Sequence, residues 1–472
     1  MHPLTFDRRS FLASAGGGFG ALALAHLLAG ETRGAPAAAS SQILHHAPKV
    51  KRVVQLFMNG GCSQMDTFDY KPELEKQHGK QVDFGIKATV TGTPGPAMKS
   101  PFPFKQHGET GRWVSSVLPH LAKCVDDLAF LMACASKSNV HGPASYFQNT
   151  GFVLPGFPCM GAWISYALGS IVDNLPTFVV LPDSRGLPYN NTGNFTSAFL
   201  PASHAGTVIK PSSPQPVPFL RAPEAAKQIT SASEVASLSL LDKLNRNHLA
   251  ERQGDTRLSA RIDSLELAAK MQLSAPEALD LARETPATHK LYGLDRPETE
   301  GMARNCLLAR RLLERGVRFV QVWSGMGGPS RNWDNHTDIP KELPFIAGSA
   351  DQPFAALIQD LKQRGMLDDT LVVGTTEFGR MPCTQSGVGR DHNQGTFVTW
   401  LAGAGIKAGA TFGKSDDFAF ATAEGKTYVH DLHATILHLL GIDHTRLTFR
   451  HDGIDRRLTD VHGHVIKEIL SG

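Results

Sequence analysis

The sequence has few cysteines and no paired cysteine motif. Its six cysteines are scattered over 472 residues, and no two of them stand in a C-x-x-C arrangement. This spacing excludes a zinc knuckle and a dense disulfide framework as the basis of the fold. We expect most of the cysteines to be small buried hydrophobic residues, while one or two disulfides stay open for an oxidising compartment.

A strong charge of one sign is also missing. The formal net charge is +3, which argues against a nucleic acid as the main partner. Beyond the N-terminal segment, no apolar run is long and clean enough to span a membrane, so we expect no membrane span after removal of that segment. With 41% hydrophobic residues, the length fits one large α/β domain or two ordinary ones.

Residues 1–39 have the pattern of an export signal. The letters DRRSFL at positions 7–12 contain a twin-arginine pair, an apolar Gly/Ala-rich run follows, and the small residues GAPAAASS come next. This pattern resembles a Tat signal, so we expect export by the Tat machinery to the periplasm or the cell surface. Residues 40–472 are then expected to form one α/β domain.

Short apolar runs alternate with helical stretches along the rest of the chain. The runs at 51–58, 128–134, 177–181, 318–323, 371–374 and 397–402 predict strands, and the stretches at 114–127, 160–169, 298–315, 353–365 and 429–440 predict helices. This alternation predicts a doubly wound, mostly parallel sheet with helices on both faces. The charged region at about 225–290 has helical spacing, and we expect it to be a helical insertion.

Polar side chains recur directly after the predicted strands. Because α/β sheets place ligand chemistry at the carboxyl ends of their strands, these side chains could converge on one edge of the sheet. The candidate metal ligands are Asp66, Asp334, His336, Glu377, Asp391 and His392, a mixed oxygen and nitrogen set that divalent ions use. The alternative, an ion pair between Glu377 and Arg380 beside turn-forming aspartates and structural histidines, remains open at this point.

This set of Asp and His residues, together with the segment DLHATILHLLGI at residues 431–442, resembles the alkaline phosphatase–sulfatase superfamily. More narrowly, the chain resembles the exported sulfatase-like family common in planctomycete bacteria, domain of unknown function 1501. The segments that match this family are the twin-arginine leader, NGGCSQMDTFD, HGPASYFQNTG, MGAWISYALGS, NWDNHTD, TEFGR, GRDHNQGTF and DGIDRRLTDVHGHVIKEIL. The resemblance implies an alkaline phosphatase-like fold with one or two divalent ions, zinc first and calcium, magnesium or manganese as alternatives.

The same resemblance implies roles for individual residues. Asp334 and His336 match the paired ligands of one metal, and Glu377 stands where the superfamily usually has an aspartate at a strand end. His392, with Asp391, matches the late ligand pair. Asp66 resembles the carboxylate of the first strand, although it lies several residues beyond that strand.

The chain departs from the superfamily at the nucleophile. No stretch fits the C/S-x-P-x-R pattern that sulfatases convert to formylglycine. Hydroxyl candidates for this role are Thr150, Ser145, Ser138 and Ser63. Arg380 or His141 is expected to stabilise the charge that builds up on the transferred group.

Two functions from different classes follow from these patterns. The first is an exported metal-dependent hydrolase of phosphate or sulfate esters, acting on a small-molecule or glycan ester. The alternative is a non-catalytic, metal-containing module that binds sulfated or phosphorylated glycans at the cell surface, because a fold alone does not decide activity.

Overall fold

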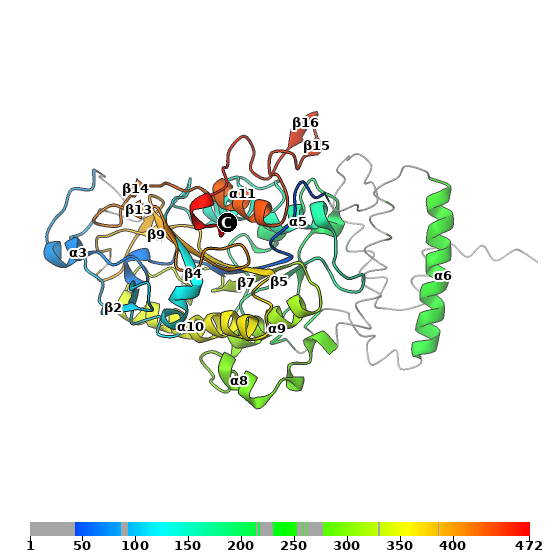
Figure 1. Ribbon diagram of the computed structural model, residues 1–472, viewed down its shortest axis with the longest axis horizontal. Helices are drawn as coiled ribbons and strands as arrows, with labels where there is room; N and C mark the ends of the chain where they lie inside the picture. The colour runs from blue at the N-terminus through cyan, green and yellow to red at the C-terminus, as the bar shows by residue number, and fades with distance from the viewer. Residues whose placement is uncertain are drawn as a thin grey trace, which may run out of the picture.

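The computed structural model describes residues 43–85, 93–213, 216–217, 230–252, 258, 262, 277–328, 331–385 and 387–472. The expected export signal at residues 1–39 lies outside the described residues, and so does much of the expected insertion at 225–290. The described part of that insertion includes the helix α6 (Ser231–Ala250), which lies apart from the rest in Figure 1.

An eight-stranded sheet forms the centre of the molecule (Figure 1). Its strand order is β12-β4-β11-β8-β1-β7-β5-β6, with bounds Thr411–Phe412, Leu128–Cys134, Phe397–Gly403, Thr370–Thr375, Arg52–Met58, Phe319–Ser324, Phe178–Leu181 and Thr207–Val208. Strand β11 runs antiparallel to both of its neighbours, and the other pairs are parallel. The predicted mostly parallel α/β fold is therefore confirmed.

The central strand β1 buries both of its faces. Val54 and Leu56 face the core shared with helices α9 (Glu300–Glu314) and α10 (Ile339–Gln363). Val53 and Phe57 face the opposite core, shared with α5 (Met160–Leu168) and α11 (Val429–Leu439). A fully buried side chain of this kind contributes about 1.5–3 kcal/mol relative to its exposed state, which explains the continuous apolar run in the sequence.

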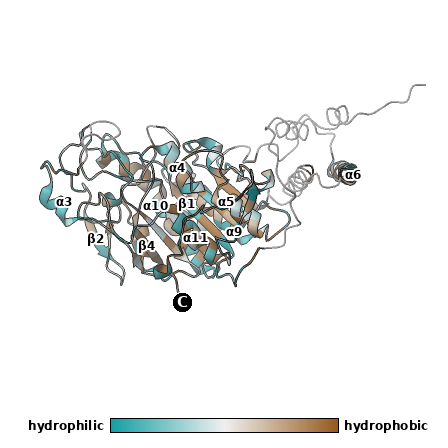
Figure 2. Ribbon diagram, turned by 90° about the horizontal axis from the view of Figure 1, so that it is seen from above, coloured by the Kyte–Doolittle hydropathy of each residue, from teal (hydrophilic) through white to brown (hydrophobic). Residues whose placement is uncertain are grey.

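The helices lie in two layers around this sheet. In Figure 1, α9 and α10 lie below the sheet, and α5 and α11 lie above it. Figure 2 shows hydrophobic colouring on the central strands and hydrophilic colouring on the peripheral helix α3 (Pro72–Gln77). In the described ranges, the other α-helices are α4 (His141–Thr150) and α8 (Pro286–Tyr292). The other strands form the two-stranded pairs β2–β3 (Phe104–His107, Arg112–Ser115), β9–β10 (Gly379–Arg380, His392–Asn393), β13–β14 (Lys414–Ser415, Thr422–Glu424) and β15–β16 (Phe449–His451, Ile454–Arg456).

Two predicted helices have different bounds in the structure. The helix expected at 114–127 is a 3-10 helix over Leu121–Asp127 that follows strand β3, because Pro119 lies inside the expected range and restricts the residue before it. The helix expected to begin at Pro353 begins at Ile339 and continues through Pro344 and Pro353.

All six cysteines are buried and unpaired, so the small-hydrophobe interpretation holds and no disulfide forms between them. No helix in the described ranges is long and apolar enough to cross a membrane.

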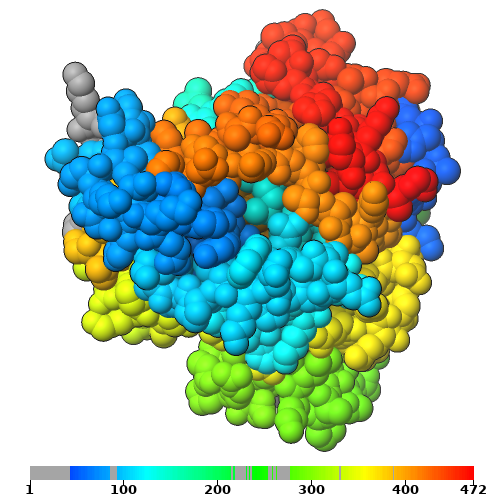
Figure 3. All heavy atoms as spheres, turned by 60° about the vertical axis from the view of Figure 1, so that its left-hand side comes forward, coloured from blue at the N-terminus to red at the C-terminus, as the bar shows by residue number. Residues whose placement is uncertain are grey.

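Figure 3 shows early segments, in blue and cyan, side by side with late segments, in orange and red, on one face. The contact of Lys49 Nζ with the carbonyl oxygens of Ser471 and Gly472, at 2.7 and 2.9 Å, joins the two ends of the domain directly.

Three neighbouring strands end together at the edge that carries the candidate site. In the parallel register of β1 with β8 and β7, Phe57 lies beside Thr375 and Met58 lies beside Ser324. The loops that follow these strands therefore leave the sheet at the same level, as the sequence pattern predicts.

Candidate metal centre

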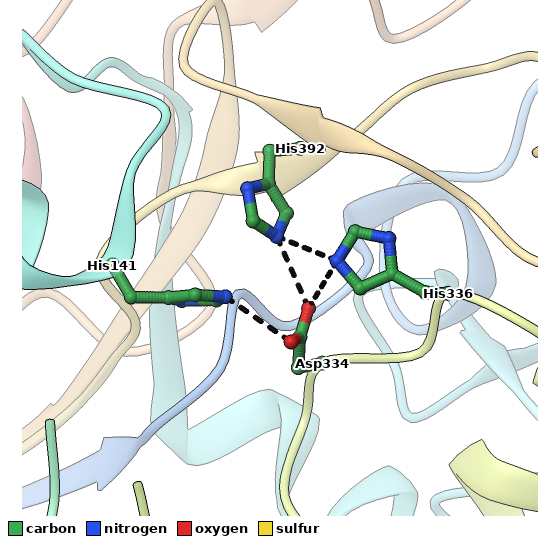
Figure 4. A group of neighbouring side chains, drawn as sticks. All are labelled: His141, Asp334, His336 and His392. Atoms are coloured by element: carbon green, nitrogen blue, oxygen red, sulfur yellow. Dashed lines mark hydrogen bonds and ion pairs between the residues drawn. The ribbon is translucent and has the colours of Figure 1, made fainter. Parts of the chain in front are cut away.

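Four side chains from three separate regions converge at this edge. They are His141 at the start of α4, Asp334 and His336 in the loop after β7, and His392 in β10. One ligand atom of each lies within 4.8 Å of the others. Figure 4 shows the three imidazole rings directed toward the Asp334 carboxylate.

Each of the three imidazoles has its Nδ1 atom fixed by an acceptor. The acceptors are Glu377 Oε1 for His141 at 2.8 Å, Gln385 Oε1 for His336 at 2.5 Å and the Asn139 carbonyl oxygen for His392 at 2.7 Å. An Nδ1–H donated to such an acceptor sets the tautomer, so the Nε2 atom of the neutral ring keeps its lone pair. This arrangement is typical of metal-binding histidines, whose outer nitrogen is held by a carboxylate, amide or carbonyl oxygen.

The Nε2 atoms all face the same small volume. Those of His336 and His392 are 2.7 Å apart, and they lie 2.7 and 3.1 Å from Asp334 Oδ1. The buried Nε2 atom of His141 lies 3.3 Å from Asp334 Oδ2 and forms no hydrogen bond. Three lone pairs and a carboxylate at such distances repel one another unless a proton or metal cation lies between them, so the donor set fits a divalent ion.

The electrostatics of Asp334 favour a bound cation. Burial alone would raise the pKa of Asp334, but the Arg380 guanidinium and the three imidazoles hold that pKa far below its ordinary value. The carboxylate is therefore ionised over the whole physiological range, which a metal ligand requires.

The surroundings shift the pKa values of His392 and His141 in opposite directions. Burial, together with Arg380 and His141, lowers the pKa of His392 to about 4, so this imidazole is neutral and ready to bind at neutral pH. Burial also opposes the charge on His141, but Asp334 and Glu377 outweigh that effect and raise the pKa of His141. A divalent ion at the His141 Nε2 atom would compete with a proton for the same lone pair.

Arg380 lies directly behind the site and is fully buried. One of its terminal nitrogens lies 2.6 Å from Asp334 Oδ1, and the same nitrogen donates to the carbonyl oxygens of Gly60 and Trp333. Its Nε donates to the Gly61 carbonyl oxygen at 2.8 Å, and its other terminal nitrogen donates to the Arg390 carbonyl oxygen at 3.1 Å. With these donors engaged, Arg380 is placed to orient Asp334, and its expected role in stabilising charge on the transferred group stays a prediction.

Two glycines let the loops approach closely enough to form this arrangement. Gly60 has a φ of +120°, and a Cβ atom there would lie 2.6 Å from the Asp334 backbone nitrogen. A Cβ atom at Gly389 would lie 1.7 Å from the His336 carbonyl oxygen. Any other residue would displace the loop that presents Asp334 and His336.

The remaining predicted ligands take other positions. Glu377 lies behind His141 and accepts from its Nδ1, so it orients a ligand and is not one of the four converging groups. Asp391 accepts from the backbone N–H of His392 at 2.7 Å. Asp66 forms a fully buried ion pair with Arg390, at 2.6 Å to its Nε, and also lies outside the group.

The predicted catalytic residues are likewise divided. His141, expected to stabilise charge, lies among the four converging groups. Thr150 ends the ten-residue helix that His141 begins, about 13 Å away along the helix axis, and its hydroxyl donates to the Tyr146 carbonyl oxygen at 2.8 Å. Thr150 therefore does not take part in the site as drawn from the sequence.

Residues that the sequence did not single out complete the surroundings. Tyr189 stacks on His141 with ring centroids 4.2 Å apart and planes 3° apart, and its hydroxyl lies 3.5 Å from Asp334 Oδ2. The Phe378 ring packs against both His141 and His392 at 4.9 and 4.7 Å. Phe378 directly follows the predicted ligand Glu377, so the sequence could have indicated it as a neighbour of the site. No local sequence pattern indicates Tyr189.

Solved structures with some similarity to this chain include a sulfatase, a phosphonate monoester hydrolase and an alkaline phosphatase. A sulfatase from Pseudoalteromonas sp. is 13% identical with a TM-score of 0.36, over 86% of this chain and 74% of that one. The phosphonate monoester hydrolase from Silicibacter pomeroyi is 14% identical with a TM-score of 0.31, over 69% and 68%. An alkaline phosphatase from the Antarctic bacterium TAB5 is 11% identical with a TM-score of 0.31, over 79% and 96%. These values are too low to transfer a substrate or a residue's role.

The comparison of sequences gives a more specific result. No curated protein sequence matched the chain. The sequence model of one family matches residues 50–470, which include the whole sheet and all four converging residues. The chain therefore belongs to the family described as "Protein of unknown function (DUF1501)".

Proposed function

We propose that this chain is a metal-dependent hydrolase of sulfate or phosphate esters, with the metal held by His141, Asp334, His336 and His392. One observation supports it above the others: three imidazoles fixed at Nδ1 direct their Nε2 atoms into one volume beside an ionised carboxylate. Three nitrogens and one oxygen suit zinc best, and other divalent ions of the first transition row bind such sets as well.

A bound divalent ion would supply a Lewis acid for the ester oxygens and would lower the pKa of a coordinated water. The chain's own residues provide the geometry. Glu377 and Tyr189 hold the His141 ring from its edge and its face, and Arg380 holds Asp334. His336 is the most exposed of the four side chains, at 23%, so we propose that the substrate approaches from its side.

The attacking group is proposed to be water. Within the described ranges, the one hydroxyl group that bonds to the four residues is the phenol of Tyr189. Burial, together with Asp334 and Glu377, raises the pKa of that phenol further above its ordinary value, so it stays protonated and is a poor nucleophile. Cys62 is fully buried, and burial raises the pKa of its thiol to about 12, so it is a poor nucleophile.

The cellular location belongs to the same proposal. The twin-arginine pattern at positions 7–12 supports export by the Tat route to the periplasm or the cell surface. A small-molecule or glycan ester that the organism meets outside the cytoplasm is then the proposed substrate.

The test is a metal analysis followed by a substrate screen. Purified full-length protein is analysed for bound metals, reloaded with zinc, manganese, magnesium or calcium, and assayed with aryl sulfates, aryl phosphates and phosphodiesters. We expect turnover that requires the metal and is lost in Asp334→Asn. Protein without any bound metal, before or after reloading, would contradict the proposal.

A second candidate function is a non-catalytic module that binds sulfated or phosphorylated glycans. It is favoured by the observation that no serine or threonine hydroxyl bonds to the four residues within the described ranges, and that Thr150, one of the predicted hydroxyl candidates, lies at the opposite end of α4 from His141. Metal-dependent binding of a sulfated glycan without turnover of any ester would select this alternative.

A further inference from the structure

The groups around the four ligands limit how many ions the centre can bind. A second ion near Asp334 would need carboxylates of its own, and Glu377 and Asp66 are the obvious suppliers because the sequence places both after strands of the same edge. The contacts of these two carboxylates therefore decide the question.

Glu377 is held through Oε1, which accepts from the Gly60 backbone N–H and from His141 Nδ1, both at 2.8 Å. Oε2 lies 3.1 Å from the Thr376 hydroxyl, whose single hydrogen also has the Met58 carbonyl oxygen as an acceptor at 2.7 Å. Because Glu377 is fully buried and its Oε1 holds both the Gly60 loop and the His141 ring, a second ion bound through Oε1 would have to displace these two bonds.

The carboxylate of Asp66 already has a cation. Arg390 contacts both of its oxygens, at 2.6 and 3.2 Å, and the Ser63 hydroxyl donates to it at 2.5 Å. Asp66 and Arg390 are both fully buried, and their opposite charges cancel. The Asp66 carboxylate is therefore already paired with a cation and is not available to a metal.

A guanidinium occupies the other side of Asp334. Arg380 lies 2.6 Å from Asp334 Oδ1 and 3.4 Å from His336 Nε2, with its donors directed at backbone carbonyl oxygens on three sides. The guanidinium already occupies this side of Asp334, so a second divalent cation has no free position there.

We infer that the centre binds one divalent ion per chain and that the Arg380 guanidinium is a fixed second cation that positions Asp334. This inference rests on the metal site of the proposed function and chooses between one ion and two, which the sequence leaves open. Arg380 is a positioning residue that acts through Asp334, since its donors contact Asp334 and backbone carbonyl oxygens.

The first experiment measures stoichiometry. Full-length protein is loaded with zinc chloride, freed of excess metal and analysed for zinc per chain, and the loading is repeated with manganese chloride. We expect one ion per chain. Two ions per chain would overturn the inference and leave the proposed metal dependence intact, whereas no bound ion would overturn both.

Variants of Glu377 and Arg380 extend the test without an activity assay. Glu377→Gln removes a candidate ligand of a second ion, and we expect the stoichiometry to stay at one. A fall from two to one would contradict the inference. Arg380→Met removes the fixed cation, and we expect zinc affinity at least tenfold weaker than in the parent, with Arg380→Lys recovering part of the loss.

Matched measurements keep the outcome interpretable. Circular dichroism reports whether each variant is folded, and His438→Ala on the far part of α11 serves as a control whose zinc affinity is expected to equal that of the parent. Parent-like zinc affinity in folded Arg380→Met would overturn the positioning role. Where Arg380→Met does not fold, the partial loss in Arg380→Lys and the stoichiometry of Glu377→Gln decide the question.

Discussion

His336 and His392 direct their Nε2 atoms at each other across 2.7 Å, while Gln385 and the Asn139 carbonyl oxygen hold their Nδ1 atoms from behind. Two neutral imidazoles in this tautomer cannot hydrogen-bond to each other, because both Nε2 atoms are acceptors. The arrangement becomes favourable when a cation lies between the rings, and several expectations follow for experiments on the purified protein.

Removing a ligand should weaken metal binding. For His392→Ala we expect at least about tenfold lower zinc affinity, equivalent to roughly 1.4 kcal/mol. Thermal stability in zinc-containing buffer should fall as well, because a ligand that binds only the native state stabilises it. Isothermal titration of this variant beside His438→Ala checks the expectation, and equal affinity in His392→Ala and the parent would exclude His392 as a ligand.

The residues that orient the ligands should matter almost as much. Gln385→Ala removes the acceptor for His336 Nδ1, and loss of such a partner typically lowers metal affinity by about 10–100-fold. Gln106→Ala, at an exposed position of β2, is the matched control. Zinc titration against a competing chelator measures both variants, and indistinguishable values would show that Gln385 does not support the site.

The Asp66–Arg390 ion pair is expected to stabilise the fold but not to affect the amount of metal that the protein binds. Asp66→Asn leaves the fully buried Arg390 without its counter-ion, and breaking such a pair costs about 3–5 kcal/mol. We expect a large fall in the free energy of unfolding in urea, while the folded fraction keeps its zinc. If Asp66→Asn lost its zinc but kept the stability of the parent, Asp66 would be a metal ligand after all.

Acid should destabilise the protein through a buried histidine that is not one of the four converging residues. His433 on α11 has no exposed area, and burial lowers its pKa to about 3. Its folded pKa lies below the unfolded value of about 6.5, so the unfolded chain binds the proton first and stability falls as the pH drops from about 6.5 toward 3. The slope from one such group is about 1.4 kcal/mol per pH unit.

His433→Gln should reduce this slope by about that amount. Urea unfolding of parent and variant at pH 5, 6 and 7, with a chelator present so that metal binding does not contribute, measures the difference. Parallel stability curves for the two proteins would mean that His433 takes up its proton equally well in the folded and unfolded states.

Export is expected to depend on the arginine pair near the N-terminus. Arg8→Lys combined with Arg9→Lys should retain the protein in the cytoplasm, because the Tat route reads this pair, and should leave the mature domain folded. Cell fractionation with an antibody checks the location. Normal export of the double variant would reject the Tat assignment.

The fold could be predicted from the sequence because its main elements depend on local patterns. The apolar run at 128–134 and the strand that leads into Thr375 are buried on both faces, and such strands have a distinctive composition. The start of helix α10 was harder to predict, because a proline such as Pro353 often marks the first turn of a helix. In the structure the helix begins 14 residues earlier, at Ile339, and residues before Pro353, such as Ile346, are packed in the core. The direction of β11 was also not predictable, because an antiparallel strand has the same apolar pattern as a parallel one.

The site could be predicted in part for a related physical reason. Asp334, His336 and His392 follow strands, so their position at one edge is implied by the topology. The actual partner of Asp66 depends on Arg390, a residue 324 positions away, and only the folded chain determines that this carboxylate meets a guanidinium. The stacking of Tyr189 on His141 likewise depends on the packing of a loop against a distant helix start.

The converging side chains also constrain how the protein is made. His141 and the carbonyl oxygen of Asn139 precede the middle of the chain, whereas His392, which Asn139 holds, lies 253 positions later. Contacts of such long range form late, after the entropy of closing large loops has been overcome. A nascent chain therefore lacks the complete set of four side chains until His392 in β10 has been synthesised and packed, so full-affinity metal binding would require that nearly the whole chain has been made and folded.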